Sequence, residues 1–307
     1  MNHIYDSIII GGGPAGYTAA MYGARAGLDL LVIERMSVGG QMALTADIDN
    51  YPGFNEGIDG FTLGMRMQKA AERFGAKTEY AEVLSVELSD KVKKVETDSG
   101  SFLAKTVIIA TGANPRELGI DGEDRLIGRG VHYCAHCDGR FYKDMTVGVV
   151  GGGNSAVSDA LLLSRLAKKV YLILRRDSLR ATKIYREALM KAENVEIIWN
   201  SKITDFVADD RLSAIRISDI GDENTREIPI NAVFVSIGRS PATNLFRDIL
   251  ALDGSGYIVA DESTKTNIDG VYAAGDVRTK VLRQVVTATA DGASAATMAE
   301  EYISQNF

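Results

Sequence analysis

The residues best suited to chemistry in this 307-residue chain lie in one short stretch, C-A-H-C at positions 134–137. It holds both cysteines, Cys134 and Cys137, together with His136, and His132 stands two residues upstream. Two cysteines separated by two residues can close a small disulfide ring and reopen it, as a reversible two-electron redox pair requires. The same four side chains are also of zinc-ligand type, although such tight spacing would strain a tetrahedral site. A redox dithiol and a metal module are therefore both open at this point.

A glycine-rich turn near the start of the chain predicts a dinucleotide site. Apolar residues 7–10 indicate a buried strand, G-G-G-P-A-G follows at 11–16, and a helix and a second strand over 28–33 complete the unit. Such glycines let a pyrophosphate approach the backbone at the N-terminus of the helix. Glu34 ends the second strand, where an acid accepts hydrogen bonds from the hydroxyls of an adenosine ribose. The first site therefore predicts FAD or NAD.

The same unit recurs 140 residues later, with a different ending. A strand over 146–150 leads into G-G-G-N-S-A at 151–156, a helix follows to Leu166, and a strand over 169–174 ends at Arg175 and Arg176. Arg180 lies four residues beyond Arg176. Guanidinium groups bind a 2'-phosphate with charge-assisted, often bidentate hydrogen bonds, whereas an acid would repel it. The second site is therefore predicted to take NADP(H).

The order of these units predicts an α/β protein with two Rossmann-like dinucleotide-binding domains, the second inserted in the first. Residues 270–276 form a short apolar strand ending in Gly275-Asp276, and a carboxylate there suits the ribityl chain of a flavin. The C-terminal stretch is thus expected to rejoin the first domain, giving residues 1–114 with 243–307 and an inserted domain over 115–242. We expect antiparallel strands over 78–96, strands over 203–217 and 228–237 completing the inserted domain, and helices over 61–74 and 286–303.

Composition excludes several classes of function. The net charge of -7 and the lack of a basic block argue against a nucleic-acid-binding protein. No apolar stretch approaches the length of a membrane span, and the N-terminal residues lack the basic start and long apolar region of a secretory signal. We therefore expect a soluble cytoplasmic protein, in which a lone C-x-x-C is a redox or metal site rather than a structural staple.

Taken together, the motifs resemble those of the bacterial low-molecular-weight thioredoxin reductases, which belong to the class II pyridine nucleotide-disulfide oxidoreductases. The resemblance spans essentially the whole chain. It rests on G-G-G-P-A-G at 11–16, G-G-Q at 39–41, C-A-H-C-D-G at 134–139, G-G-G-N-S-A at 151–156, R-R-D-S-L-R at 175–180, A-A-G-D at 273–276 and R-Q at 283–284. Related flavoproteins share some of these motifs but rarely all of them.

The resemblance implies FAD in the outer domain, NADPH in the inserted domain, a homodimer, and thioredoxin or a thioredoxin-like protein as partner. It implies that electrons pass from NADPH through FAD to a Cys134–Cys137 disulfide, with Cys137 facing the flavin, Cys134 attacking thioredoxin and Asp138 handling protons. The implied FAD residues are Gly11, Gly13, Pro14, Ala15, Gly16, Glu34, Arg35, Gly40, Gln41, Asn50, Ala113, Asp276, Arg283 and Gln284. The implied NADPH residues are Gly151, Gly153, Asn154, Ser155, Arg175, Arg176, Arg180 and Gly238.

Two positions depart from the family pattern, and two alternative flavoproteins remain. His136 replaces a small polar residue, so we expect a slightly less reducing dithiol, and Arg140 stands where an aromatic residue often docks thioredoxin. A related flavin disulfide reductase linked to ferredoxin or to oxygen would lack a 2'-phosphate site, against which the arginines argue. An NADPH:ferredoxin-type flavoprotein would have no cysteine pair.

Overall fold

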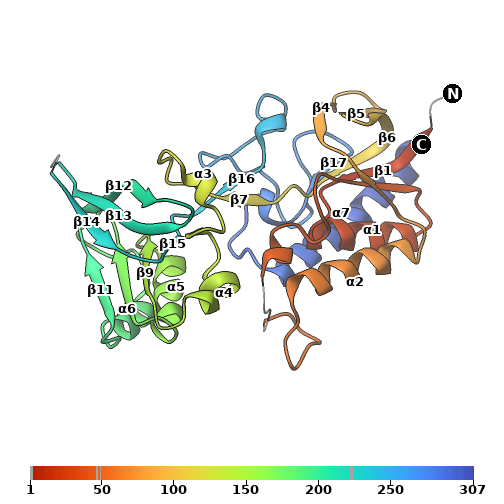
Figure 1. The fold of residues 1–307 in the computed structure, drawn as a ribbon. Helices are drawn as coiled ribbons and strands as arrows, with labels where there is room; N and C mark the ends of the chain where they lie inside the picture. The colour runs from red at the N-terminus through yellow and green to blue at the C-terminus, as the bar shows by residue number, and fades with distance from the viewer. Residues whose placement is uncertain (1–2, 46–47, 49, 222–223) are drawn as a thin grey trace. The chain divides into compact units, whose positions relative to one another are not determined.

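The computed structural model describes residues 3–45, 48, 50–221 and 224–307, without the side chains of Leu44, His136 and Cys137. The chain forms two units (Figure 1). The first unit comprises residues 1–114 and 240–307, and the second comprises residues 115–239. The chain therefore passes back into the first unit at Ser240, compared with the expected position 243.

The first unit is built on a sheet whose strand order is β3-β2-β1-β6-β5-β4, with β17 also paired to β6. Its strands are β1 (Ile4–Ile10), β2 (Leu30–Glu34), β3 (Lys77–Tyr80), β4 (Val83–Glu87), β5 (Lys93–Thr97), β6 (Gly100–Ile109) and β17 (Val271–Ala273). β1 pairs in parallel with β2 and β6, and β17 pairs in parallel with β6. The C-terminal part of the chain thus completes the sheet that the N-terminal part begins.

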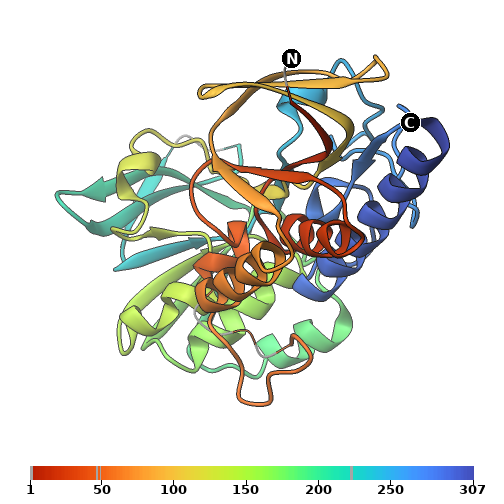
Figure 2. The same ribbon diagram turned by 90° about the vertical axis from the view of Figure 1, so that its right-hand side faces the viewer.

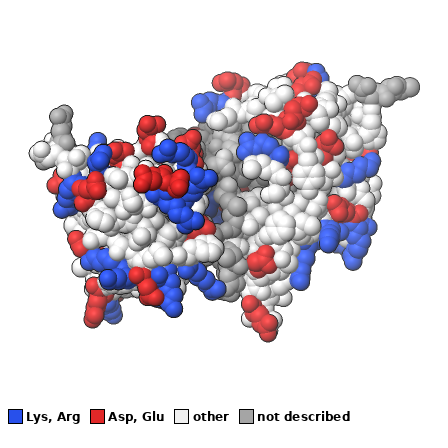
Figure 3. All heavy atoms as spheres, viewed as in Figure 1, with Lys and Arg blue, Asp and Glu red and all other residues white. Residues whose placement is uncertain are grey.

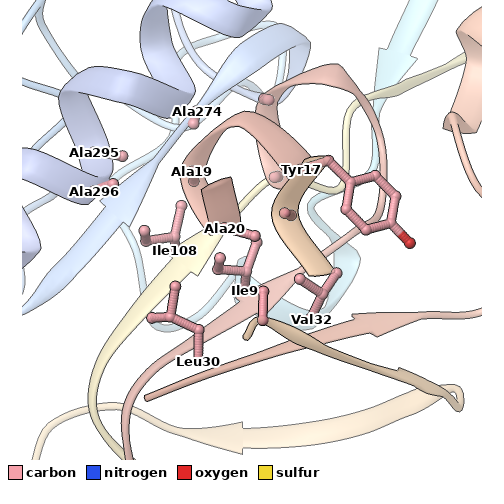
Figure 4. Close-up of a cluster of buried hydrophobic side chains, with 14 of the residues drawn as sticks. Ile9, Tyr17, Ala19, Ala20, Leu30, Val32, Ile108, Ala274, Ala295 and Ala296 are labelled. Atoms are coloured by element: carbon pink, nitrogen blue, oxygen red, sulfur yellow. The ribbon is translucent and has the colours of Figure 1, made fainter. Parts of the chain in front are cut away.

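Three helices cover one face of this sheet: α1 (Pro14–Arg25), α2 (Gly60–Glu72) and α7 (Val285–Asn306). Figures 1 and 2 show α1 lying between α2 and α7. In Figure 4, strand residues such as Ile9 and Ile108 point toward small residues on the helices, including Ala19 and Ala295. Small side chains let helix backbones lie close together, and a Cβ added at Gly292 would stand 2.2 Å from the carbonyl oxygen of Ala15.

The second unit repeats this plan with the all-parallel sheet β11-β10-β9-β15-β8. The strands are β8 (Val131–His132), β9 (Thr146–Val150), β10 (Lys169–Ile173), β11 (Val195–Ile198) and β15 (Ala232–Val235). The helical segments are α3 (Glu123–Leu126), α4 (Ala135–Asp138), η2 (Gly139–Tyr142), α5 (Asn154–Ser164) and α6 (Lys183–Leu189). An all-parallel sheet in the second unit and a mixed, mainly parallel sheet in the first, each with helices packed on it, confirm the predicted α/β class.

One expectation about strand pairing was wrong in part. β3 was expected to be antiparallel, but it pairs in parallel with β2, and only β4 and β5 of that stretch are antiparallel. In the second unit, β12 (Ser201–Ala208), β13 (Leu212–Asp219) and β14 (Thr225–Pro229) form a separate antiparallel sheet. β15 instead joins the parallel sheet between β9 and β8, where all four of its side chains are buried.

The two segments at which the chain passes between units are β7 (Ala113–Pro115) and β16 (Arg239–Pro241), and they form a two-stranded sheet. Acidic and basic side chains are interspersed on the face shown in Figure 3, as the modest net charge suggests. Within the described ranges, no helix is both long enough and apolar enough to cross a membrane.

Candidate active site

The first glycine turn is shaped by backbone contacts that leave no room for side chains. Gly11 has a φ of +109°, and a Cβ there would lie 2.4 Å from the carbonyl oxygen of Ala110. A Cβ at Gly16 would lie 1.8 Å from the carbonyl oxygen of Gly11, so the first turn of α1 packs directly on the strand end. Gly13 differs, because a Cβ there would meet nothing within 4 Å. The turn is therefore closed on the protein side and open at Gly13, where a pyrophosphate would approach.

The N-terminus of α1 is suited to binding an anion. Gly13 is its N-cap, no side chain caps it, and its first turn, which begins Pro14-Ala15-Gly16, contains no acidic residue. Helix amides and the helix dipole favour a negative group at such a position.

Glu34 stands at the end of β2 and is held by two backbone amides. Gly12 N–H donates to its Oε2 at 2.7 Å, and Met36 N–H donates to its Oε1 at 2.9 Å. The carboxylate therefore sits behind the glycine turn in a fixed orientation, with lone pairs left to accept from ribose hydroxyls. The neighbouring Arg35 is exposed and 3.4 Å from the Glu82 carboxylate. Sequence reasoning placed Glu34 correctly at the strand end.

Other predicted FAD residues converge on the same unit from distant parts of the chain. A Cβ at Gly40, in η1 (Gly40–Leu44), would lie 3.5 Å from the Cα of Gly13. Gln41 Nε2 is 3.5 Å from Asn114 Oδ1, and Asn50 Nδ2 donates to Gln284 Oε1 at 2.9 Å. Asn50 and Gln284 are thus brought together across 234 residues.

The remaining predicted FAD residues lie at the turn after β17 and on the segment before α7. Asp276 is half-buried in η4 (Gly275–Val277). Arg283 lies over the Tyr257 ring at 3.9 Å, and its Nε is buried without a hydrogen-bond partner among the described residues. Ala113 is buried on β7. An orphaned guanidinium nitrogen of this kind fits a site that a polar cofactor completes.

The Gly275 turn is held by a buried charge cluster that the sequence did not reveal. Asp291 on α7 accepts hydrogen bonds from Gly275 N–H at 2.8 Å, from Arg278 Nε and Nη2 at 2.8 and 2.7 Å, and from Lys280 Nζ at 2.7 Å. The exposed fractions of these side chains are 6% for Asp291, 2% for Arg278 and 6% for Lys280. Burial raises the pKa of Asp291, but the hydrogen bonds from Arg278, Lys280 and Gly275 outweigh it and lower the pKa overall. The only sequence signal was an aspartate on an otherwise small-residue helix.

The second glycine turn repeats the backbone of the first. Gly151 has a φ of +140°, and a Cβ there would lie 2.3 Å from the carbonyl oxygen of Ser236. Gly153 caps α5 and has nothing within 4 Å of where its Cβ would stand. Asn154 and Ser155, the first residues of α5, are exposed beside it. This turn is also open where a pyrophosphate would bind.

The strand end behind this turn carries free cations instead of an acid. Arg175, Arg176 and Arg180 are exposed, and none of them forms an ion pair within the part of the chain that the structure describes. Arg180 N–H donates to the carbonyl oxygen of Gly152 at 2.8 Å, and Asn154 Oδ1 accepts from Thr182 N–H at 2.8 Å. These two bonds tie the arginine-bearing loop to the glycine turn. The residues present fit a 2'-phosphorylated nucleotide.

Gly238 lies on the segment leading to β16, two residues after Ser236, whose carbonyl oxygen faces Gly151 of that turn. It has a φ of +106°, and its carbonyl oxygen accepts from Arg116 N–H at 3.0 Å. Its positive φ lets the chain turn in the short connection between β15 and β16.

The C-A-H-C stretch forms a single helical turn, α4, within the second unit. Cys134 is disulfide-bonded, and the only other cysteine of the chain is Cys137, whose side chain, like that of His136, lies outside the described residues. Asp138 N–H donates to the carbonyl oxygen of Cys134 at 3.1 Å. A Cβ at Gly139 would lie 2.9 Å from Leu163 Cδ2, so this glycine lets the turn pack against α5.

Asp138 is bonded to a residue that the sequence singled out only as a zinc-ligand candidate. His132 Nδ1 lies 2.9 Å from Asp138 Oδ2, and His132 Nε2 lies 2.7 Å from Tyr142 Oη. Both ring nitrogens of His132 are therefore engaged by protein groups, and Cys134 is in a disulfide. Neither residue is available as a zinc ligand in this arrangement, and the described residues contain no cluster that could hold a metal ion.

Known proteins resemble this chain along its full length. Residues 5–292 match the family described as pyridine nucleotide-disulphide oxidoreductase. A thioredoxin reductase from Peptoclostridium acidaminophilum is 44% identical, with 100% of this chain and 99% of that protein covered. One from Listeria monocytogenes is 46% identical over 98% of this chain and 95% of that protein. The crystal structure of Lactococcus lactis thioredoxin reductase matches with a TM-score of 0.84 at 41% identity, over 98% of this chain and 99% of that one.

Proposed function

This chain belongs to the pyridine nucleotide-disulphide oxidoreductase family, and from that premise we propose that it is an NADPH-dependent thioredoxin-disulfide reductase. One observation carries the proposal. A disulfide-bonded C-x-x-C turn lies in the same unit as a glycine turn whose strand end presents exposed arginines that form no ion pair with any described residue. A dithiol site and an NADPH-type site in one unit are what such a reductase needs.

The proposal assigns FAD to a domain of residues 1–114 and 243–307 and NADPH to a domain of residues 115–242, which differ from the two units of the structure only at residues 240–242. Gly13 and Glu34 support FAD, because one is open to a pyrophosphate and the other is an oriented acid at the ribose position. The Nε of Arg283, which is buried and has no hydrogen-bond partner among the described residues, is a further donor available to FAD. Gly153, Arg175 and Arg176 support NADPH for the corresponding reasons. When bound, the two cofactors supply the electron pair that opens the disulfide.

In this proposal the chain's own residues carry out the exchange with the partner. Cys134, as a thiolate, attacks the partner disulfide and forms a mixed disulfide, and Cys137 then attacks Cys134 and releases the reduced partner. Asp138 takes and returns the protons, as the family resemblance implies. The partial exposure of Asp138, 33% for its side chain, leaves it within reach of solvent.

Thioredoxin is proposed as the partner, because the relatives named above are thioredoxin reductases. A homodimer is also proposed. Exposed apolar side chains on the helix layer of the first unit, Tyr22, Phe61 and Val286, support a second copy packing there. A cytoplasmic location is proposed because a reducing compartment keeps such a dithiol in use. Sedimentation equilibrium tests the dimer, and a monomer at micromolar concentration would contradict it.

Anaerobic reduction tests the function. NADPH added to the purified flavoprotein is expected to bleach the flavin absorbance, NADH is expected to act far more slowly, and added thioredoxin is expected to restore the absorbance while gaining free thiols. The Cys134→Ser variant should still bleach but should not reduce thioredoxin. Bleaching by neither nucleotide would overturn the NADPH site, and bleaching without thioredoxin turnover in the native protein would overturn the partner.

A further inference from the structure

His132 is buried beside the C-A-H-C turn with a hydrogen bond at each ring nitrogen. His132 is only 5% exposed. Nδ1 lies 2.9 Å from the Asp138 carboxylate, and Nε2 lies 2.7 Å from the Tyr142 hydroxyl. Asp138, His132 and Tyr142 thus form a continuous chain that runs from the partly exposed dithiol turn into the unit's interior.

Packing fixes the position of the ring. His132 is stacked on Phe234 with ring centroids 5.3 Å apart and an interplanar angle of 25°, and β8 places these two residues in register with β15. Tyr142 meets both rings edge-on, at 5.2 and 5.9 Å. The imidazole therefore has no room to turn away from either partner, and protons are what can move along the chain.

An imidazole between a carboxylate and a phenol can hold its proton at either end. With Asp138 ionised, Nδ1–H donates to the carboxylate, and Nε2 either accepts from the Tyr142 hydroxyl or, in the imidazolium, donates to its oxygen. With Asp138 protonated, the carboxyl donates to Nδ1 and Nε2–H donates to the Tyr142 oxygen. The Asp138–His132 pair can thus take up one proton and return it without breaking either hydrogen bond.

Tyr142 acts as an anchor in this chain and not as a proton donor. Burial raises the pKa of Tyr142, the positive charge of Arg211 lowers it, and the negative charge of Asp138 raises it, with a net rise. The phenol therefore stays neutral at physiological pH and fixes the orientation of the imidazole. Phe234 on β15 and Ala135 on α4, which also pack here, bring no charge.

From this geometry we infer that His132 is a positioning residue that stores the exchange proton for Asp138. The inference rests on the proposed dithiol function. As Cys137 attacks the mixed disulfide, the Cys134–Cys137 bond forms, the bond from Cys134 to the partner breaks, and the Cys137 thiol proton passes to the Asp138–His132 pair. The partner's leaving thiolate then takes that proton from the pair, so that protons and electrons balance.

Imidazole NMR tests this without any turnover, because the chain has only three histidines, His3, His132 and His136. The variants His3→Asn and His136→Thr assign the three signals. Reducing the disulfide with dithiothreitol is expected to move the titration of the His132 signal to higher pH, since a nearby thiolate favours the imidazolium. The Asp138→Asn substitution should change that response, because the carboxylate that shares the exchange proton with His132 is lost. His3, which bonds the exposed Asp29 in the other unit, is the internal control and should respond to neither change.

Kinetics provide a second readout. His132→Asn keeps an amide N–H that can face Asp138 but cannot titrate. Its rate of thioredoxin reduction should fall about tenfold, and the inflection that the Asp138–His132 pair gives to the pH profile should be lost, while reduction of the flavin by NADPH is unchanged. Tyr142→Phe should shift that inflection along the pH axis without abolishing it. His3→Asn should alter neither the rate nor the pH profile.

The outcomes separate this inference from the proposed function. A His132 signal that does not titrate between pH 5 and 9, or that titrates identically in the oxidised and reduced protein, would overturn the inference, and so would an unchanged pH profile in a folded His132→Asn variant. If that variant does not fold, the NMR of the native chain still decides. A His132 signal that follows the dithiothreitol-reduced disulfide in a protein unable to reduce thioredoxin would support the inference and overturn the proposed partner.

Discussion

Gly12 in the first turn and Gly152 in the second occupy the same position in two strand–turn–helix units, yet their backbones bond to different neighbours. Gly12 N–H donates to the Glu34 carboxylate, whereas the carbonyl oxygen of Gly152 accepts from Arg180 N–H. One turn is thereby linked to an acid at its strand end and the other to an arginine loop. A shared backbone thus provides for a pyrophosphate in both units, while the residues just behind the turn set the adenosine each prefers.

The two turns also differ in the other segments that pack against them. The first packs against η4, which comes from the C-terminal part of the chain and is held by Asp291 with Arg278 and Lys280. The second is completed by residues within its own continuous unit, such as Asn154 and Thr182. We therefore expect damage to the first site to spread across the unit, and damage to the second to stay local.

The largest effect is expected at the sixth position of each glycine motif, which is Gly16 in the first unit and Ala156 in the second. Gly16→Ala places a Cβ against the carbonyl oxygen of Gly11, where the gap is 1.8 Å, and should lower the free energy of unfolding by about 3 kcal/mol and release flavin. The corresponding position of the second unit is already an alanine, so Ala156→Gly is the matched control and should retain both cofactors. Thermal unfolding and flavin absorbance measure both. A Gly16→Ala protein as stable as the native one would show that the two turns are not packed differently.

Asp291→Asn should be nearly as damaging, because it leaves two buried cations without a full counter-charge. We expect a loss of about 3 kcal/mol at pH 7. The pKa of Asp291 is lowered in the folded chain, so its contribution is present above the unfolded-state value and is lost as pH falls through the folded one. The native chain should therefore lose stability in acid, and the variant should lose less. Urea unfolding across pH 3–7 measures this, with Asp121→Asn, at an exposed aspartate outside the cluster, as control. Parallel curves for Asp291→Asn and the native protein would contradict the prediction.

The double substitution Arg175→Gln and Arg176→Gln should impair the choice of nucleotide without unfolding the chain. The KM for NADPH is expected to rise about 100-fold, because two charge-assisted hydrogen bonds are lost, and the KM for NADH should hardly change. Arg226→Gln removes an exposed arginine of β14, in the separate antiparallel sheet of the second unit, and should leave both values unchanged. An equal rise in KM for NADH and NADPH would show that the arginines at this strand end do not distinguish the two nucleotides.

The smallest effect is expected from Asn154→Ala. It removes the acceptor of Thr182 N–H and should loosen the arginine loop, raising the KM for NADPH about fivefold through the loss of roughly 1 kcal/mol. Flavin content should stay the same. A loss of flavin on this substitution would mean that the second turn is not independent of the first.

Short-range patterns predicted both glycine turns, both strand ends and the disulfide turn, because each depends on residues close in sequence. Strand direction was not predictable in the same way, since the alternation over residues 77–80 is the same whether the neighbouring strand is parallel or antiparallel. β15 was expected only to continue a run of alternating strands, although its unbroken apolar residues suit a strand buried on both faces.

The interactions missed are those between side chains brought together by tertiary packing. Asp291 gave no sign of its bonds to Arg278 and Lys280, because a carboxylate on a helix is ordinarily exposed. His132 was considered only for its proximity to the cysteines, and its partner Tyr142 lies ten residues away on another element. Pairings of this kind depend on side-chain directions that a linear pattern does not contain.

The pairing of β17 with β6 and the packing of α7 on α1 have a consequence for synthesis of the chain on the ribosome. Because β17 and α7 emerge last, the sheet of the first unit and the helix layer covering it stay incomplete until nearly the whole chain has been translated. Residues 115–239, by contrast, contain every element of the second unit and emerge in one uninterrupted run. Domains generally fold as units during translation, so the second unit is expected to fold first. The apolar strands of the first unit stay partly exposed until β17 and α7 have been synthesised.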